Sequence, residues 1–148
     1  MRTLSIDLGT RRVGLALSDE GGKLATPFDV LQVSSPRHAI EQILPILQRE
    51  SVRRLLVGVP LNMDDTLGPA ARNTIAWAKD LASRANLPLV LIDERLSSFD
   101  AEQSLITRKR SGEKITRKQK KQRLDALAAA GFLQAFLDGK LKALAIAE

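Results

Sequence analysis

The order of strand-like and helical segments is the feature that most restricts the fold. Three strand-like segments open the chain with only short, glycine-containing turns between them, which predicts an antiparallel meander. The later apolar segments alternate with helical patterns, which predicts parallel strands joined by crossover helices. We therefore expect an α/β fold: a five-stranded mixed sheet, with a three-stranded antiparallel meander followed by two parallel strands, flanked by helices on both faces.

Local signals place the boundaries of these elements. We expect strands over residues 4–7, 13–19, 24–33, 53–59 and 88–92, and helices over 36–50 and about 70–85. The last helix is expected to begin at Thr116, because Thr116 and Gln119 have the spacing of a capping box. Pro45 lies inside the first helical pattern, so we expect it to kink or interrupt that helix.

Length and composition limit the architecture further. With 148 residues, of which 44% are hydrophobic, the chain can bury one core and is short for two, so we expect a single domain over residues 1–148. No apolar run approaches the ~20 residues that span a bilayer, and the N-terminus lacks the apolar core of a signal peptide. We expect a cytoplasmic protein with no membrane partner.

Three carboxylates, Asp7, Glu94 and Asp125, lie where an expected element ends or begins. If these elements are neighbours, the acids converge, and a cation is needed to relieve their repulsion. Hard oxygen ligands favour Mg²⁺ or Mn²⁺, and a chain with no cysteine and one histidine excludes a thiolate or multi-histidine zinc site. Two such ions can clamp the oxygens of a phosphoryl displacement. The pattern predicts a metal-dependent nuclease with these acids as ligands and catalytic residues.

The middle ligand can be Asp93 or Glu94, which are adjacent. Because side chains alternate along a strand, the two acids point to opposite faces, and only one is expected to reach the metals. We favour Glu94 and expect Asp93 to have a capping or structural role. Arg95 then either pairs with a carboxylate or holds the scissile phosphate.

The basic residues are concentrated in one segment. Residues 108–123 contain nine Lys and Arg and one Glu, a net charge of +8 in a chain of +6, so the rest of the chain is −2. A field directed from one segment suits a polyanion, and we predict that this segment binds nucleic acid. A solvated helix face is the alternative. The residues expected to contact the substrate here are Lys114, Arg117, Lys118, Lys120 and Lys121.

Two turns near the acids carry weaker signals. Arg11 and Arg12 follow Asp7, and they are expected either to contact backbone phosphates or to be exposed hairpin charges. Asn62, Asp64 and Asp65 follow the strand at 53–59, at an edge where open α/β sheets bind ligands. Their residue types are equally typical of an ordinary turn.

The sequence also resembles a known family. An acid at the end of the first strand, in this order of elements, is similar to the ribonuclease H-like fold. Four blocks resemble the YqgF family, also called RuvX, whose relatives are the RuvC Holliday junction resolvases. They are IDLGTRRVGLALSD at 6–19, VGVPLNMDDT at 57–66, DERLSS at 93–98 and LDALAAAGFLQAFLDG at 124–139.

The resemblance implies that Asp7, Glu94 and Asp125 form the acidic triad of a nuclease. It implies one of two substrates, precursor 16S ribosomal RNA or branched four-way DNA, and we favour the RNA because the likeness to YqgF is closer than that to RuvC. Two positions depart from the family pattern: Asp65 stands where a glycine is expected, and Ser98 where threonine is expected.

Two other classes of function compete with this prediction. Asp7-Leu8-Gly9-Thr10 is also similar to the first phosphate-binding turn of actin-like ATPases and sugar kinases, but those proteins need two duplicated domains. A non-catalytic nucleic-acid-binding module is the second alternative, although it would not need three acids. The sequence does not decide whether the enzyme is an endonuclease or an exonuclease, or whether it prefers Mg²⁺ or Mn²⁺. It also does not decide between a monomer and a homodimer.

Overall fold

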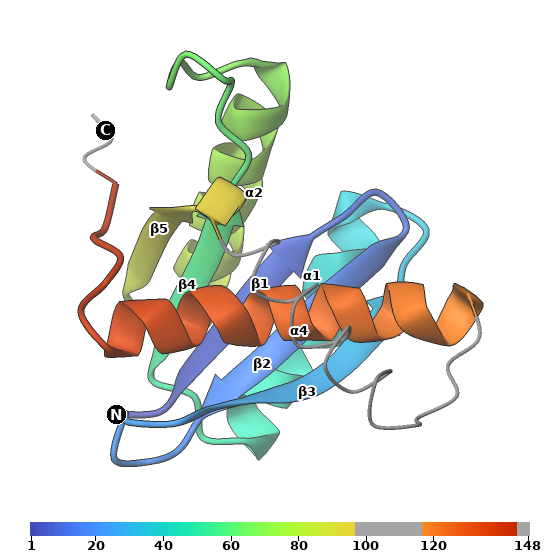
Figure 1. Ribbon diagram of the computed structural model, residues 1–148. Helices are drawn as coiled ribbons and strands as arrows, with labels where there is room; N and C mark the ends of the chain where they lie inside the picture. Colours follow the sequence, from blue (N-terminus) through green and yellow to red (C-terminus); the bar gives the residue numbers. More distant parts are fainter. Residues whose placement is uncertain (97–116, 145–148) are drawn as a thin grey trace.

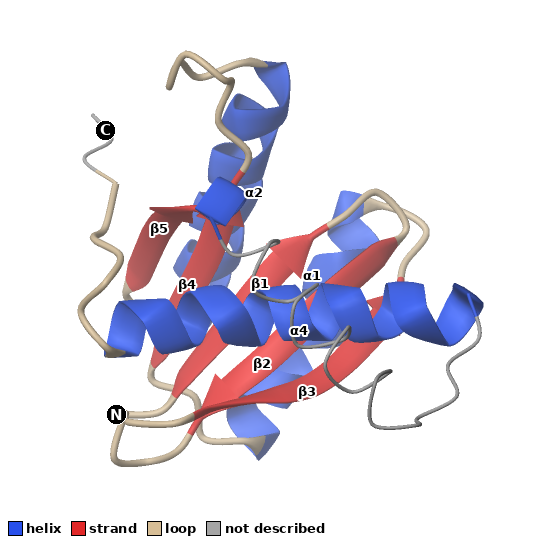
Figure 2. Cartoon of the chain, in the orientation of Figure 1, coloured by secondary structure: helices blue, strands red, loops and turns tan. Residues whose placement is uncertain are grey.

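The computed structural model describes residues 1–96 and 117–144, and Figure 2 shows its helices and strands. Their order matches the predicted order. The elements are β1 (Thr3–Leu8), β2 (Arg12–Ser18), β3 (Ala25–Gln32), α1 (Pro36–Arg49), β4 (Arg54–Val59), α2 (Pro69–Ala85), β5 (Leu89–Asp93), the 3₁₀ turn η1 (Glu94–Leu96) and α4 (Arg117–Leu137). The predicted cap, Thr116, lies outside the described residues, one position before α4 begins.

The five strands form one mixed sheet in the order β3-β2-β1-β4-β5. β1 pairs antiparallel with β2 and parallel with β4, β2 pairs antiparallel with β3, and β4 pairs parallel with β5. The predicted meander followed by two parallel strands is confirmed. β1 therefore lies at the centre of the sheet, where an acid at its end is surrounded by neighbouring strands.

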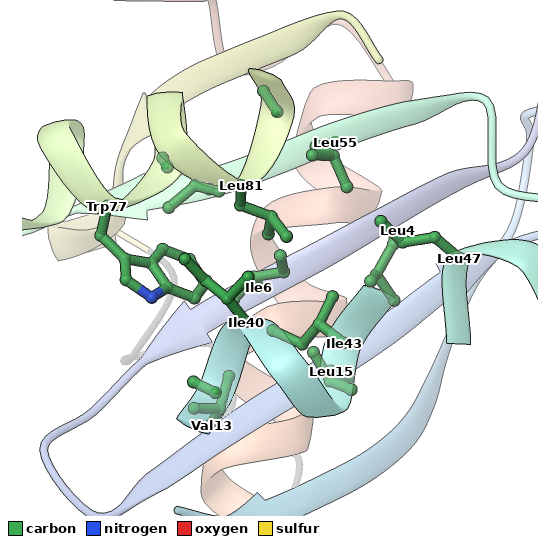
Figure 3. Close-up of a cluster of buried hydrophobic side chains, with 14 of the residues drawn as sticks. Leu4, Ile6, Val13, Leu15, Ile40, Ile43, Leu47, Leu55, Trp77 and Leu81 are labelled. Atoms are coloured by element: carbon green, nitrogen blue, oxygen red, sulfur yellow. The ribbon is translucent and has the colours of Figure 1, made fainter. Parts of the chain in front are cut away.

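Helices cover both faces of the sheet (Figure 1). α1 and α2 pack together on one face, and α4 crosses the other face, over β2, β3 and β1. Figure 3 shows the main core, in which Leu4, Ile6 and Leu15 of the sheet meet side chains of α1 and α2, such as Ile43 and Leu81. No helix in the described part of the chain is long and apolar enough to cross a membrane.

Helix α1 corrects one expectation, because it runs through Pro45 without interruption. Pro45 and Glu41, one turn earlier, both lie on the exposed side of the helix. The carbonyl of Glu41, which loses its helical N–H partner to the proline ring, therefore faces water and can be hydrated. The buried side of α1, with Ile40 and Ile43, keeps its packing.

The sheet face beneath α4 is lined by small residues. Ser5 donates a hydrogen bond of 2.7 Å to the backbone carbonyl of Ala129, and both residues are fully buried. A Cβ atom placed on Gly14 would lie 2.0 Å from the carbonyl oxygen of Asp125, a distance that no real contact tolerates. The helix therefore lies close to the sheet at Ala129 and at Asp125, with Ser5 and Gly14 as the residues beneath it.

We predict that Gly14→Ala displaces the N-terminal half of α4 from β2. The free energy of unfolding should fall by about 1–3 kcal/mol or more, the usual cost of overpacking, in urea denaturation followed by circular dichroism. Gly21→Ala is the matched control, because its nearest neighbour would lie at 3.6 Å, in ordinary contact. Equal stability of the two variants would contradict this description of the interface.

Candidate active site

Asp7 lies on the α4 side of the central strand. Along β1, Leu4 and Ile6 belong to the core under α1 and α2, whereas Ser5 bonds to α4. Strict alternation therefore directs Asp7 to the same face as Ser5. In the register of the sheet Asp7 is opposite Gly14, against which the backbone of α4 at Asp125 rests. Asp125 was expected at the start of an element, but it lies inside α4, in the third turn, because the helix begins at Arg117.

Glu94 reaches the same face from the end of β5. Its side chain hydrogen-bonds with that of Asp7, whereas Asp93 forms an ion pair with Arg95. A Cβ on Gly58, in the adjacent strand β4, would lie only 2.8 Å from the Cβ of Glu94. Our sequence reasoning missed Gly58 and Gly14 as residues that shape the site. Their signal was available, since a glycine inside an apolar strand often marks a close approach.

Asp7 and Glu94 share a proton near neutral pH. Burial and then the charge of Asp125 raise the pKa of Asp7 to about 6, against the opposing effect of the hydrogen bond with Glu94. Burial and then the charge and hydrogen bond of Asp7 raise the pKa of Glu94 to about 8. Between these values Glu94 is protonated and donates to the Asp7 carboxylate, as expected for two acids that compete for one desolvated space.

Asp125 is close enough to affect Asp7 but is paired with Arg12. The Nε of Arg12 lies 3.1 Å from Oδ2 of Asp125, and both side chains are about 30% exposed. The angles at this contact do not make a hydrogen bond, so the buried Oδ2 has a cation beside it but no hydrogen-bond partner among the described residues. Burial raises the pKa of Asp125, and the Arg12 guanidinium opposes this shift.

The donor atoms of these acids fit a hard divalent cation. All three side chains offer carboxylate oxygens, two of them hold a proton between them, and Oδ2 of Asp125 lacks a hydrogen-bond partner in the described structure. With the side chains as they stand, however, no group of three or more acidic or histidine side chains within residues 1–96 and 117–144 is gathered closely enough to hold an ion. Asp125, the third acid, is paired with Arg12 instead.

Arg95 joins the end of β5 to the loop between β4 and α2. Its guanidinium contacts both carboxylate oxygens of Asp93, the backbone carbonyl of Asn62 at 2.7 Å and the carboxylate of Asp65. Of the two roles expected for Arg95, the structure contains the carboxylate pairing. Because Glu94 lies between Asp93 and Arg95, this set of contacts, here called the Arg95 clamp, also fixes the backbone at Glu94.

The departure at Asp65 now has a structural meaning. Asp65 has a positive φ of 68°, a conformation that favours glycine, which explains why a glycine is expected there. The aspartate costs backbone strain but supplies a ligand for Arg95. Asp64, next to it, caps the same loop by accepting hydrogen bonds from Thr66, so these polar residues hold the turn together.

An open pocket of about 440 Å³ lies beside the Arg12–Asp125 pair. Its lining consists of Gly9, Thr10, Arg11, Arg12, Gln32 and Asp125. Arg11 is exposed and Arg12 is half-buried, so the two residues have different environments. A larger open pocket, of about 740 Å³, is lined by residues of α1, α2 and their following loops and by none of the three acids.

The predicted basic segment lies largely outside the described residues. Lys114 is among the residues that the structure does not describe. For Arg117, Lys118, Lys120 and Lys121 it describes the helical backbone of α4 but not the side chains. Their contact with substrate stays a prediction.

A five-stranded sheet of this order, with acids at the ends of β1 and β5 and on the crossing helix, defines a ribonuclease H-like nuclease fold. Among solved structures, the RuvC of T. thermophilus bound to a Holliday junction substrate matches with a TM-score of 0.60 and 18% identity, covering 97% of this chain and 99% of that one. A Fowlpox virus resolvase bound to Holliday junction DNA matches with a TM-score of 0.56 and 11% identity, covering 96% and 100% of the two chains. These likenesses confirm the predicted fold.

The chain belongs to the RuvX family, described as Holliday junction resolvase, whose model matches residues 1–139. Curated relatives bear the name "Putative pre-16S rRNA nuclease". One from Geobacillus sp. (strain WCH70) is 39% identical over 142 residues, 95% of this chain and 99% of the relative. Another, from Acidiphilium cryptum (strain JF-5), is 38% identical, covering 93% and 84%. The predicted family and enzyme class, a hydrolase of phosphodiester bonds, are confirmed.

We predict that the metal-free protein becomes less stable as the pH rises through the raised pKa values of the acid pair. The folded state favours the protonated carboxyls, so their stabilising effect is complete below the ordinary values near 4 and is lost through about 6 and 8. Asp7→Asn should therefore raise the free energy of unfolding at pH 8 by about 1–3 kcal/mol and change it little near pH 4. Urea denaturation in a chelator measures both.

Asp19→Asn provides a control of opposite sign. Backbone N–H groups of Leu24 and Lys23 lower the pKa of Asp19, so its replacement should destabilise the protein most at neutral pH. Asp7→Asn behaving like Asp19→Asn would contradict the assignment of a strained acid pair.

We predict that Arg95→Gln loosens the loop between β4 and α2. The amides of Asn62 and Asp65, which are bonded within the loop, should exchange with deuterium faster, because the clamp to Asp93 is lost. Arg84→Gln, which removes only a pair with Asp80 on α2, is the matched control. Unchanged deuterium exchange in Arg95→Gln would show that the hydrogen bonds within the loop are enough to stabilise it.

Proposed function

We propose that this protein is a metal-dependent nuclease that processes precursor 16S ribosomal RNA, with Asp7, Glu94 and Asp125 as catalytic metal ligands. The observation that carries the proposal is the pair of carboxyls of Asp7 and Glu94, which are hydrogen-bonded to each other in a desolvated space and whose pKa values are both raised by burial and by neighbouring negative charge. A fold that needed only to bind RNA would gain nothing from acids that repel the phosphates. Their cost to stability is understandable at a metal centre.

The metal would be Mg²⁺ or Mn²⁺, held by carboxylate oxygens of the three acids. When bound, such ions activate a water nucleophile and stabilise the charge that develops on the phosphate. Asp7, on the central strand, interacts with both Glu94 and Asp125, so it is the best candidate for a shared ligand. The bonds from Arg95 to both oxygens of Asp93 favour Glu94 over Asp93 for this role.

The protein's own cations would hold the substrate backbone. The pocket lined by Arg11, Arg12 and Asp125 adjoins the acids, so a phosphate there would lie next to the metal site. The basic segment at 108–123 would bind further phosphates along the nucleic acid. Because the described contacts of Arg95 are all with Asp93, Asn62 and Asp65, it is the weakest candidate for a phosphate ligand.

Ribosomal RNA is favoured over branched DNA by the relatives of similar length. The proteins that share 39% and 38% identity carry the rRNA nuclease name, whereas the junction-bound RuvC shares 18%. Cleavage of four-way DNA is the second candidate, supported by the family description and by the nearly full-length likeness to RuvC. The first activity belongs in the cytoplasm and needs only a monomer. The second requires a homodimer with two sites.

The test is cleavage of two labelled substrates, a precursor 16S rRNA end and a synthetic four-way DNA junction, in Mg²⁺, in Mn²⁺ and in chelator. We predict metal-dependent cutting of the RNA. Asp7→Asn should reduce the rate by at least about a hundredfold, because it removes a shared ligand while leaving the substrate contacts in place. Asp19→Asn, outside the site, is the matched control for loss of one carboxylate.

Cutting of the DNA junction alone would transfer the assignment to the second candidate. Cutting that persists in Asp7→Asn would remove this acid from the mechanism. Salt-dependent binding without any cutting would favour a binding module.

A further inference from the structure

Arg12 occupies a position where a cation is needed. Its guanidinium lies 3.1 Å from the buried Oδ2 of Asp125, and this oxygen accepts no hydrogen bond from the described residues. The contact is thus chiefly electrostatic rather than a directed hydrogen bond. A positive charge beside Asp125 lowers the repulsion among the acids, which is the effect that a divalent ion would have at the same place.

The backbone at Arg12 is fixed, so only its side chain is free to move. The N–H of Gly9 donates to the carbonyl of Arg12 at 2.9 Å, and Arg12 pairs with Gln32 in the sheet. A Cβ on Gly9 would lie 2.5 Å from that carbonyl, so the tight turn requires glycine. The N–H of Val33 also binds the carbonyl of Arg11 at 2.8 Å.

The pocket beside the Arg12–Asp125 pair has room for a second position of the guanidinium. The pocket of about 440 Å³ is lined by both Arg12 and Asp125, and it is open to solvent at the exposed residues Thr10 and Arg11. An arginine side chain that leaves Asp125 therefore enters a space suited to a phosphate, which it can bind with two parallel hydrogen bonds.

We propose that Arg12 is a place-holder for the metal: it pairs with Asp125 in the metal-free protein and, when a divalent cation takes Asp125, turns into the adjoining pocket to bind a substrate phosphate. The inference rests on the proposed function and adds to it a coupling between metal binding and substrate binding. The half-exposed pair is weak enough to be displaced, since such pairs contribute little net stability. A buried, hydrogen-bonded pair would instead resist the metal.

The coupling has a thermodynamic consequence. Metal and nucleic acid should each raise the affinity for the other, because metal releases Arg12 for the phosphate and phosphate holds Arg12 away from Asp125. Without Arg12, no guanidinium competes with the metal for Asp125, and the phosphate has one arginine fewer to bind it. Arg12→Gln should therefore bind metal more tightly and nucleic acid more weakly, a combination that general damage to the site would not produce.

The experiment measures Mn²⁺ affinity by electron paramagnetic resonance without nucleic acid. We expect Arg12→Gln to bind Mn²⁺ about two- to fivefold more tightly than the wild type, the factor that corresponds to a pair worth about 0.5–1 kcal/mol. Arg12→Lys keeps a cation and should return the affinity towards the wild-type value. Arg37→Gln is the control for loss of one positive charge, because Arg37 lies exposed on α1, on the other face of the sheet.

The second readout is binding of the labelled precursor 16S rRNA end, in Ca²⁺ and in chelator, by fluorescence anisotropy. Ca²⁺ should raise RNA affinity in the wild type and in Arg37→Gln more than in Arg12→Gln. Equal or weaker Mn²⁺ binding by Arg12→Gln, or an undiminished effect of Ca²⁺, would overturn the inference and leave the nuclease proposal intact. No Mn²⁺ binding by the wild type would defeat the metal site itself and with it both proposals.

Discussion

The close packing of α4 on the sheet is the constraint on which the site depends. The helix crosses β2 where Gly14 has no side chain, and it is tied to β1 by the hydrogen bond from Ser5 to Ala129. Because Gly14 is the register partner of Asp7, the same contact that seats the helix also brings Asp125 to the central strand. Packing and chemistry thus rely on the same few small residues.

This arrangement places three acids in a poorly solvated space, where their negative charges repel one another. The protein reduces this repulsion in two ways. Asp7 and Glu94 share a proton, and Asp125 takes the charge of Arg12. In the account proposed above, a divalent ion would replace both the shared proton and the guanidinium. By contrast, Asp93 is bound through several contacts to Arg95, which makes it part of the scaffold. The two adjacent acids therefore differ in their contacts, since Asp93 binds Arg95 and Glu94 hydrogen-bonds with Asp7.

The fold could be predicted from the sequence because its signals are local and agree with one another. Alternating apolar positions in β1 and β2, helical periodicity in α1 and α2, and turns with glycine specify the elements and their order. Pro45 does not interrupt α1, and the exposure that lets water reach the freed carbonyl of Glu41 is a tertiary property that local sequence does not give. Strand alternation also predicts that Asp93 and Glu94 point to different sides, and in the structure Asp93 pairs with Arg95 whereas Glu94 hydrogen-bonds with Asp7.

The details of the site could not be predicted, since they depend on contacts between distant segments. Nothing near Arg12 in the sequence indicates that it pairs with Asp125, more than a hundred residues away, instead of lying free in a hairpin. The same is true of Arg95 and Asp65, which meet across two loops. Gly58 and Gly14 carried a readable signal, but what each makes room for, Glu94 or α4, emerges only when the strands and the helix are assembled.

The central claim is that Asp7, Glu94 and Asp125 together hold divalent metal. It is tested most directly by a crystal structure with Mn²⁺, in which anomalous scattering locates the ions independently of any assumed chemistry. The account predicts anomalous peaks at the carboxylates of Asp7, Glu94 and Asp125, with the Arg12 guanidinium no longer on Asp125. A peak elsewhere, or no peak in a crystal where Arg12 still pairs with Asp125 at saturating Mn²⁺, would contradict it.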